Sequence, residues 1–390
     1  MAIEGRGDKA LGKIRYGMVG GGEGAFIGAV HRLAARMDDH YELVAGALSA
    51  SPEKAIRSAK ALGLAEDRCY GDYQTMARAE KARKDGIEAV AIVTPNHLHV
   101  PPAIAFLKAG IHVICDKPLA ISLKEALALE KLVKSSGLVF CLTHNYTGYP
   151  MVRHARQMVA EGALGDLRII QVEYPQDWLT EPIERDGQKQ AAWRTDPKQS
   201  GGGAIGDIGT HAHNLAAFVS GLELESVLAD VDTFVKGRKV DDNVNVLLRY
   251  KGGAKGMLWA SQVAVGNENA AKLRVYGTKG GLEWRQEEPN YLTWYPYGKP
   301  QQLLTRGSPA ANASANRVTR VPPGHPEGYL EGFANIYTEA AAAIRAARAK
   351  KKPDKAVLFP TIDDGVKGMA FIEAVLKSSA KGGKWTKLGA

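Results

Sequence analysis

Short apolar segments alternate with longer segments of helical periodicity through the first third of the chain. The apolar segments lie at residues 13–19, 41–48, 87–94, 111–115 and 138–142. The segments between them carry helix signals, such as Ser51 followed by Pro52, and Ser122 with Glu125 one turn later. Strands that alternate with helices in this rhythm form a parallel, doubly wound sheet. The pattern predicts an α/β domain over residues 13–143.

The pattern changes after residue 143. A helix is predicted at residues 150–161, and strands are predicted at residues 167–174, 225–235, 243–250, 256–265, 272–276 and 282–284. Glycine pairs after Lys251 and Lys279 are typical of turns between antiparallel strands. We expect residues 144–385 to form an α+β domain with a large, mostly antiparallel sheet and a final helix at residues 363–379. One face of such a sheet must be covered by helices or by another subunit, so a homodimer or homotetramer is expected.

The first predicted strand runs directly into a glycine-rich loop. Gly20, Gly22 and Gly28 supply the glycines of a dinucleotide fingerprint, in which the backbone approaches a pyrophosphate at the start of a helix. The loop is longer than the usual G-x-G-x-x-G spacing, and it contains Glu23. This context predicts an N-terminal Rossmann fold that binds NAD or NADP.

The end of the second strand is where the adenosine ribose lies in such a fold. An acidic residue there holds the ribose hydroxyl and favours NAD. This chain has Ser49 instead, with Lys54 and Arg57 on the next predicted helix. NAD and NADP therefore both remain candidates, with NAD preferred.

The tripeptide Asp116-Lys117-Pro118 follows the fourth predicted strand. Ligands of parallel sheets bind outside the carboxyl ends of the strands, so the tripeptide should lie beside the nucleotide. Pro118 disfavours helical geometry at Lys117, which keeps this lysine at the mouth of the strand. A lysine before a proline is usually a plain surface residue. At this crevice, however, its ammonium can hold a substrate oxygen and stabilise the charge that develops on it.

A glycine run at residues 201–203 leads into a predicted helix that contains Asp207 and His211 and ends at Gly221. Side chains four residues apart share one helix face, so the carboxylate can orient the imidazole and make it a proton acceptor. The same spacing also occurs on solvated helix faces and around structural histidines. His213 points to roughly the opposite face and is interpreted as structural.

Composition narrows the class of protein. The chain has 390 residues, of which 45% are hydrophobic and 24% are charged, as in a soluble globular protein of two domains. Basic residues exceed acidic ones by 51 − 42 = 9, which favours anionic ligands, but no nucleic-acid motif is present.

Three cysteines without Cys-x-x-Cys spacing predict reduced thiols and no metal site. No apolar run approaches about 18 residues and no signal segment is recognised, so we expect a cytoplasmic protein without a membrane partner.

The motifs occur in an order that belongs to a known family. They are the glycine loop, Thr94-Pro95-Asn96 with His99, Asp116-Lys117-Pro118, Asn145-Tyr146, Trp193-Arg194, the glycine run, and Asp207 with His211. Together they resemble the GFO/IDH/MocA family of NAD(P)-dependent oxidoreductases over about residues 13–385. The usual Glu-Lys-Pro motif of the family has Asp116 here, and the longer glycine loop is a second departure.

The resemblance implies positions for the cofactor. Phe26 and Ile27 would offer backbone N–H groups to the pyrophosphate. The residues that would border the nicotinamide or otherwise contact the cofactor are Thr94, Pro95, Asn96, His99, Asp116, Lys117 and Asn145.

The resemblance also implies a reaction, which is hydride transfer between the nicotinamide and a secondary hydroxyl of a sugar, sugar derivative or cyclitol. His211 would take the hydroxyl proton, Asp207 would orient His211 or the substrate, and Lys117 would hold the oxygen. Whether Lys117 or His211 is the terminal proton acceptor stays open. The other expected substrate contacts are Asn145, Tyr146, Lys189, Trp193, Arg194 and His325.

Two other functions are compatible with these residues. One is a redox-neutral, NAD-dependent glycosidase that oxidises a sugar transiently, eliminates the aglycone and reduces the sugar again, acting on an anionic glycoside. The other is a non-catalytic, dinucleotide-binding regulator. The joint presence of Lys117, Asp207 and His211 argues against the regulator.

Overall fold

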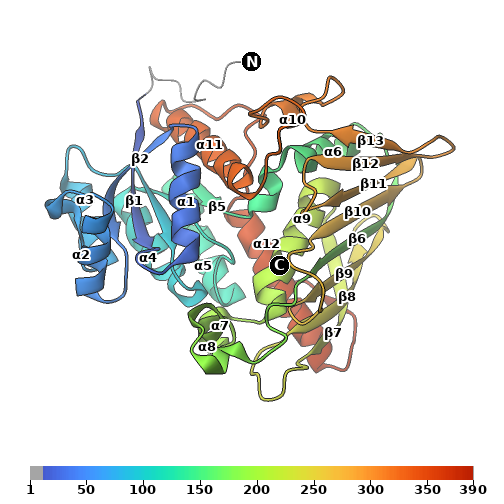
Figure 1. Cartoon of the computed structure of the whole chain (residues 1–390), viewed down its shortest axis with the longest axis horizontal. Helices are drawn as coiled ribbons and strands as arrows, with labels where there is room; N and C mark the ends of the chain where they lie inside the picture. Colours follow the sequence, from blue (N-terminus) through green and yellow to red (C-terminus); the bar gives the residue numbers. More distant parts are fainter. Residues whose placement is uncertain (1–11, 390) are drawn as a thin grey trace.

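The structure, a computed structural model, describes residues 12–389 and is built on two β-sheets (Figure 1). The first sheet has the strand order β2-β1-β3-β4-β5, and all its pairs are parallel. Its strands are β1 (Ile14–Gly20), β2 (Tyr41–Ala47), β3 (Ala89–Val93), β4 (His112–Cys115) and β5 (Phe140–Leu142). The apolar segments of the first third therefore form the predicted Rossmann sheet.

The helices that connect these strands are α1 (Phe26–Met37), α2 (Pro52–Ala61), α3 (Tyr73–Ala82), α4 (Val100–Ala109) and α5 (Leu123–Ser136). The capping positions inferred from the sequence are confirmed, because the Ser51 and Ser122 side chains each accept a hydrogen bond from a backbone N–H in the first turn. Helix α1 begins earlier than predicted, since Gly28 belongs to the helix and not to the loop.

The second sheet has nine strands in the order β13-β12-β11-β10-β6-β9-β8-β7-β14. They are β6 (Leu167–Pro175), β7 (Leu224–Asp232), β8 (Asn243–Tyr250), β9 (Lys255–Ser261), β10 (Lys272–Gly277), β11 (Gly280–Arg285), β12 (Tyr291–Pro296), β13 (Gln302–Thr305) and β14 (Thr386–Lys387). Every pair is antiparallel except β6 with β9. The expected large, mostly antiparallel sheet is confirmed, while the short strands at its two edges, β12, β13 and β14, were not predicted.

Three helices cover the inner face of this sheet and separate it from the first one (Figure 1). They are α6 (Pro150–Ala160), α9 (Thr210–Ser220) and α12 (Ile362–Ala380). No helix within residues 12–389 covers the outer face, where Ile169, Leu247 and Met257 are 43%, 46% and 46% exposed. The shorter helical segments are η2 (Glu66–Arg68), η3 (Asn96–Leu98), η4 (Asn145–Gly148), η5 (Ile183–Asp186), α7 (Lys189–Arg194), α8 (Pro197–Ser200), η6 (Ile205–Gly209) and α10 (Ala313–Asn316).

A helix from near the end of the chain covers part of the parallel sheet. Helix α11 (Tyr329–Arg348) lies beside α1, on one face of the parallel sheet (Figure 1). Its Phe333 and Tyr337 share a hydrophobic cluster with Ile14 and Met18 of β1. The parallel sheet therefore buries one of its faces with residues that come about two hundred positions later in the chain than its last strand.

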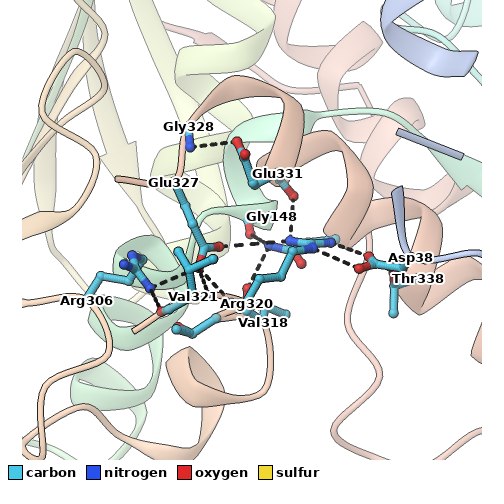
Figure 2. Close-up of polar contacts among 12 residues, drawn as sticks. Asp38, Gly148, Arg306, Val318, Arg320, Val321, Glu327, Gly328, Glu331 and Thr338 are labelled. Atoms are coloured by element: carbon cyan, nitrogen blue, oxygen red, sulfur yellow. Dashed lines mark hydrogen bonds and ion pairs between the residues drawn. The ribbon is translucent and has the colours of Figure 1, made fainter. Parts of the chain in front are cut away.

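An ion-pair network fastens the loop before α11 to the end of α1 (Figure 2). Arg320 Nε donates to Asp38 Oδ1 at 2.9 Å, and Arg306 Nη1 donates to Glu327 Oε1 at 2.9 Å. Arg320 Nη1 lies 4.0 Å from Glu327 Oε2, which links the two pairs. All four side chains are at most 10% exposed, so each charge depends on its partners for compensation.

Candidate active site

A cleft of about 630 Å³ opens at the carboxyl ends of the first four parallel strands. Its far wall comes from α7, which follows the first strand of the nine-stranded sheet in the chain. Among the predicted site residues, it is lined by Gly20, Gly22, Phe26, Ile27, Ser49, Thr94, Pro95, Asn96, Asp116, Lys117, Lys189, Trp193, Arg194 and Asp207. Ligands of doubly wound sheets bind at this edge, so the cleft has the position expected for a nucleotide.

The glycine loop lies tightly against the start of α1. A Cβ added to Gly28 would lie 2.4 Å from Gly21 Cα, so this contact requires glycine at position 28. Gly28 therefore does not line the cleft, and it serves the helix-to-loop packing of a third fingerprint glycine. No side chain caps the helix at Ala25 and its first turn holds no acidic residue, so the N–H groups of Phe26 and Ile27 suit a pyrophosphate.

Another part of the cleft lies beside the end of β2. Ser49 and Lys54 line it there, without an acidic residue directly after the strand. Glu23 pairs with Arg57 of α2, with Oε2 and Nη2 3.2 Å apart. The guanidinium group of Arg57 therefore compensates the negative charge that Glu23 brings to the glycine loop.

Thr94, Pro95 and Asn96 line the cleft after β3, but His99 does not. His99 is fully buried, with Nδ1 2.7 Å from the Pro118 carbonyl oxygen and Nε2 2.9 Å from the Thr94 carbonyl oxygen. Because both ring nitrogens contact carbonyl groups, His99 joins the loops that follow β3 and β4. The structure thus places His99 behind the wall of the cleft. The family resemblance had implied that His99 borders the nicotinamide, and this position differs from that expectation.

Asp116 ends the fourth strand and is held by Thr143, whose hydroxyl donates to Asp116 Oδ1 at 2.9 Å. Burial raises the pKa of this carboxyl, but His31, Lys117 and His99 lower it by more, so that the pKa lies below its usual range. Asp116 is therefore ionised beside the lysine that follows it.

Lys117 and Asp207 meet at the middle of the cleft. Lys117 Nζ donates to the Asp207 carbonyl oxygen at 2.7 Å and to Asp207 Oδ1 at 2.9 Å. The second carboxylate oxygen, Oδ2, accepts from Gln262 Nε2 at 2.9 Å and lies 3.4 Å from Arg194 Nε. Burial raises the pKa of Asp207, but the charges of Lys117 and Arg194 lower it to about 2. An ionised carboxylate thus anchors the ammonium group.

The predicted contact between Asp207 and His211 is not formed. Within residues 12–389 no hydrogen bond or ion pair joins the two side chains. Asp207 lies in the π-helical turn η6, and His211 lies in α9, which begins at Thr210. Both carboxylate oxygens of Asp207 are engaged instead by Lys117, Gln262 and Arg194.

His211 is buried and has an imidazole as its neighbour. Its Nδ1 lies 3.5 Å from Nδ1 of His144, and its ring centroid lies 4.9 Å from that of Tyr146. Burial lowers the pKa of His211 well below its usual range, so the ring is neutral near pH 7 and can accept a proton. His213 stacks on Phe371 with centroids 4.4 Å apart, which confirms its structural interpretation.

Asn145 and Tyr146 lie in η4, directly after β5, and both are buried. Asn145 Nδ2 has no hydrogen-bond partner within residues 12–389. The Tyr146 and Tyr174 hydroxyls contact each other, and the Asn269 side chain binds both. A buried amide donor without a protein partner suits the polar group of a ligand.

Helix α7 brings Lys189, Trp193 and Arg194 to the cleft. The Arg194 guanidinium carbon lies 4.3 Å from the Trp193 ring centroid, and Arg194 Nη1 donates to Gln190 Oε1 at 2.6 Å. These contacts orient Arg194 toward Asp207 and leave Trp193 as part of the wall.

His325 is not brought to this site. It is exposed in the loop before α11, where its carbonyl oxygen accepts a hydrogen bond from Arg306. It does not line the cleft. The loop is fixed instead by the network of Arg306, Glu327 and Arg320, which faces α1 (Figure 2).

Comparison with known proteins identifies the family. The family model described as "Oxidoreductase family, NAD-binding Rossmann fold" matches residues 14–144, and the GFO/IDH/MocA C-terminal domain matches residues 152–283. The chain belongs to the GFO/IDH/MocA family. Residues 14–144 form an NAD-binding Rossmann domain, and the protein is an oxidoreductase.

Three relatives illustrate the similarity. An oxidoreductase from Sinorhizobium meliloti is 57% identical, with a TM-score of 0.88 over 96% of this chain and 99% of that one. An inositol dehydrogenase homologue from Azotobacter vinelandii, complexed with NADH and myo-inositol, is 35% identical, with a TM-score of 0.90 over 96% and 97% of the two chains. Levoglucosan dehydrogenase from Pseudarthrobacter phenanthrenivorans is 28% identical over 94% of this chain and 96% of its own.

Several contacts of this GFO/IDH/MocA site were not foreseen from the sequence, namely those of His144, Tyr174, Gln262 and Asn269. His144 directly precedes Asn145, so its position beside a predicted site residue was the one available signal. Gln262 follows β9, and no motif marks it.

Residues 12–389 contain no group of three or more His, Cys, Asp or Glu side chains arranged to hold a metal ion. Within the same range, no helix combines the length and the apolar character that crossing a membrane requires.

Proposed function

We propose that the protein oxidises a secondary hydroxyl group of a sugar, a sugar derivative or a cyclitol with NAD. The observation that carries this proposal is the contact of Lys117 with Asp207 in a cleft whose other end is a dinucleotide-binding glycine loop. The names of the relatives support the substrate class, because one binds myo-inositol and another is named for levoglucosan.

In the proposed reaction, bound NAD would accept the hydride, and Lys117, His211 and Asp207 would each have a separate role. Lys117 donates a hydrogen bond to the substrate oxygen and stabilises the negative charge that develops on it. The hydroxyl proton moves to the neutral imidazole of His211 as the carbon–hydrogen bond yields its electron pair as hydride, which leaves a ketone. Asp207 holds the ammonium group in place through its charge.

The polar groups around these two side chains would select the substrate. Asn145 Nδ2 offers a buried donor, and Tyr146 packs beside His211. Trp193 provides an aromatic surface of the kind that packs against a sugar ring. Lys189 and Arg194 add cations at the same end of the cleft.

The test is a panel of cyclitols, sugars and glycosides, each supplied with NAD or NADP, in which the absorbance of reduced nicotinamide is followed. The proposal expects reduced cofactor to accumulate in step with the ketone product. Release of an aglycone without reduced cofactor would instead identify the redox-neutral glycosidase. Tight NAD binding without turnover of any polyol, together with full cellular function of a Lys117→Met variant, would identify a regulator.

We also propose that copies of the chain associate through the outer face of the nine-stranded sheet. Ile169, Leu247 and Met257 expose apolar surface there, and a sheet face of this size is normally covered. Light scattering after gel filtration would give the mass of a dimer or tetramer. A Leu247→Lys variant that stays folded should shift that mass toward the monomer, and an unchanged mass would contradict this arrangement.

A further inference from the structure

We propose that His144 is the positioning residue that fixes which ring nitrogen of His211 faces the substrate. This inference rests on the proposed function, because it concerns the proton acceptor of that reaction. It gives His144 the role that the sequence pattern had assigned to Asp207.

The contact between the two imidazoles carries the argument. The two Nδ1 atoms lie 3.5 Å apart, and the rings meet edge to face with an angle of 84° and centroids 5.2 Å apart. Within residues 12–389 the His211 ring makes no other hydrogen bond. Asp207 is engaged with Lys117, Gln262 and Arg194.

The chemistry of the pair then fixes the tautomer. Two neutral imidazoles that meet through Nδ1 can form a hydrogen bond only if one nitrogen carries a proton and the other does not. A His211 that accepts the substrate proton at Nε2 must carry its own proton at Nδ1 and donate it to His144. The imidazolium formed during the reaction keeps this donor bond, because Nδ1 stays protonated. His144 therefore serves His211 as an acceptor in both states.

The backbone holds the His144 ring in this place. His144 follows β5, its N–H donates to the Leu142 carbonyl oxygen at 3.0 Å, and its own carbonyl oxygen accepts from the Thr147 hydroxyl at 2.9 Å. The side chain is 2% exposed. Because the backbone on both sides of the side chain is fixed and the ring is buried, the imidazole has little freedom to turn away from His211.

The surroundings keep both rings uncharged. The groups that face His211 are Lys117, Tyr146, Tyr174 and His144. Those that act on His144 are Lys117, His213 and Asp116. Burial is the larger cause and the charge of Lys117 the next, and both lower the pKa of His144 and of His211. The pKa of His144 is lowered to about 3.

The test compares His144→Phe, which removes the acceptor, with His144→Asn, whose side-chain oxygen can take the position of Nδ1. We expect kcat of His144→Phe to fall on the order of 10²-fold, with an increased solvent isotope effect, because proton transfer becomes slower. The affinity for NAD should stay unchanged, and His144→Asn should recover most of the loss. His154→Phe is the matched control, since it removes a buried histidine of α6 that neither lines the cleft nor acts on His144 or His211, and its kcat should equal that of the wild type.

Equal losses in His144→Phe and His144→Asn, or an unchanged kcat in His144→Phe, would overturn the inference. If neither variant folds, the tautomer of the wild-type protein decides, through nitrogen chemical shifts of labelled histidine. The inference expects His211 to be protonated at Nδ1 and bare at Nε2, and the opposite tautomer would overturn it. This measurement needs no turnover, so it separates a failure of the inference from a failure of the proposed function, in which the wild type itself oxidises no polyol.

Discussion

The ammonium group of Lys117 and the carboxylate of Asp207 lie 2.9 Å apart, although 90 positions separate these residues in the chain. One follows a strand of the Rossmann sheet, and the other lies in the turn before α9. Their contact joins the nucleotide-binding half to the half that supplies α7 and His211.

Replacing Lys117 with methionine should abolish most of the activity while the cofactor still binds. The variant keeps the length of the side chain but loses the cation that stabilises the substrate oxygen, so kcat should fall by about 10²- to 10⁴-fold. Steady-state kinetics and NAD titration by fluorescence give both quantities. Lys377→Met, which removes an exposed cation of α12, should leave both unchanged. A loss of NAD affinity that matches the loss of kcat would assign Lys117 to cofactor binding instead.

The ionisation of Asp207 should make the protein less stable in acid. The pKa is lowered to about 2 in the folded state, so the stabilisation is present above the unfolded value of about 3.9 and is lost as the pH falls from about 4 toward 2. The contribution is roughly 2.5 kcal/mol, at about 1.36 kcal/mol per pKa unit. Urea unfolding of wild type and Asp207→Asn at several pH values would measure it. Identical pH dependence in both proteins would exclude this carboxyl as the cause.

The cofactor preference should change at the end of β2. Ser49→Asp places a carboxylate where the adenosine ribose is expected, so it should repel a 2′-phosphate and weaken NADP binding by at least about tenfold, or 1.4 kcal/mol. NAD binding should be retained or improved. Dissociation constants for both cofactors provide the measurement, with Ser49→Ala as the uncharged control. Equal effects on NAD and NADP would show that the ribose lies elsewhere.

The buried ion pairs in Figure 2 should matter for stability more than exposed ones do. Arg320→Met removes the guanidinium group that pairs with the buried Asp38 carboxylate, and breaking a buried pair typically costs about 3 to 5 kcal/mol. Lys251→Met breaks an exposed pair with Glu223, whose side chains are 62% and 63% exposed, and should cost less than about 1 kcal/mol. Chemical denaturation of the two variants would compare these losses. Similar losses would mean that the buried network does not fasten α11 to α1.

The sequence by itself determined that a parallel sheet is followed by a mostly antiparallel one, and it located most of the cleft. Apolar segments of strand length, separated by helices, are sufficient to predict a parallel sheet, because strands buried on both faces have no polar alternation. The glycines near residue 20 and the tripeptide at Lys117 mark strand ends, and strand ends of one sheet converge at one edge. The glycine loop, Ser49, Asp116 and Lys117 could therefore be named from local patterns, whereas the family resemblance supplied Phe26, Ile27, Thr94, Pro95, Asn96, Trp193 and Arg194.

Only the tertiary structure decided which side chains pair. Long-range packing gives Asp207 and His211 the partners Lys117 and His144, so these two side chains do not pair with each other. It also places α11 over the Rossmann sheet, buries His99 between two loops and keeps His325 outside the cleft. Helical spacing records neighbours within one regular element, whereas these contacts depend on how separate elements pack, and no local pattern carries that information.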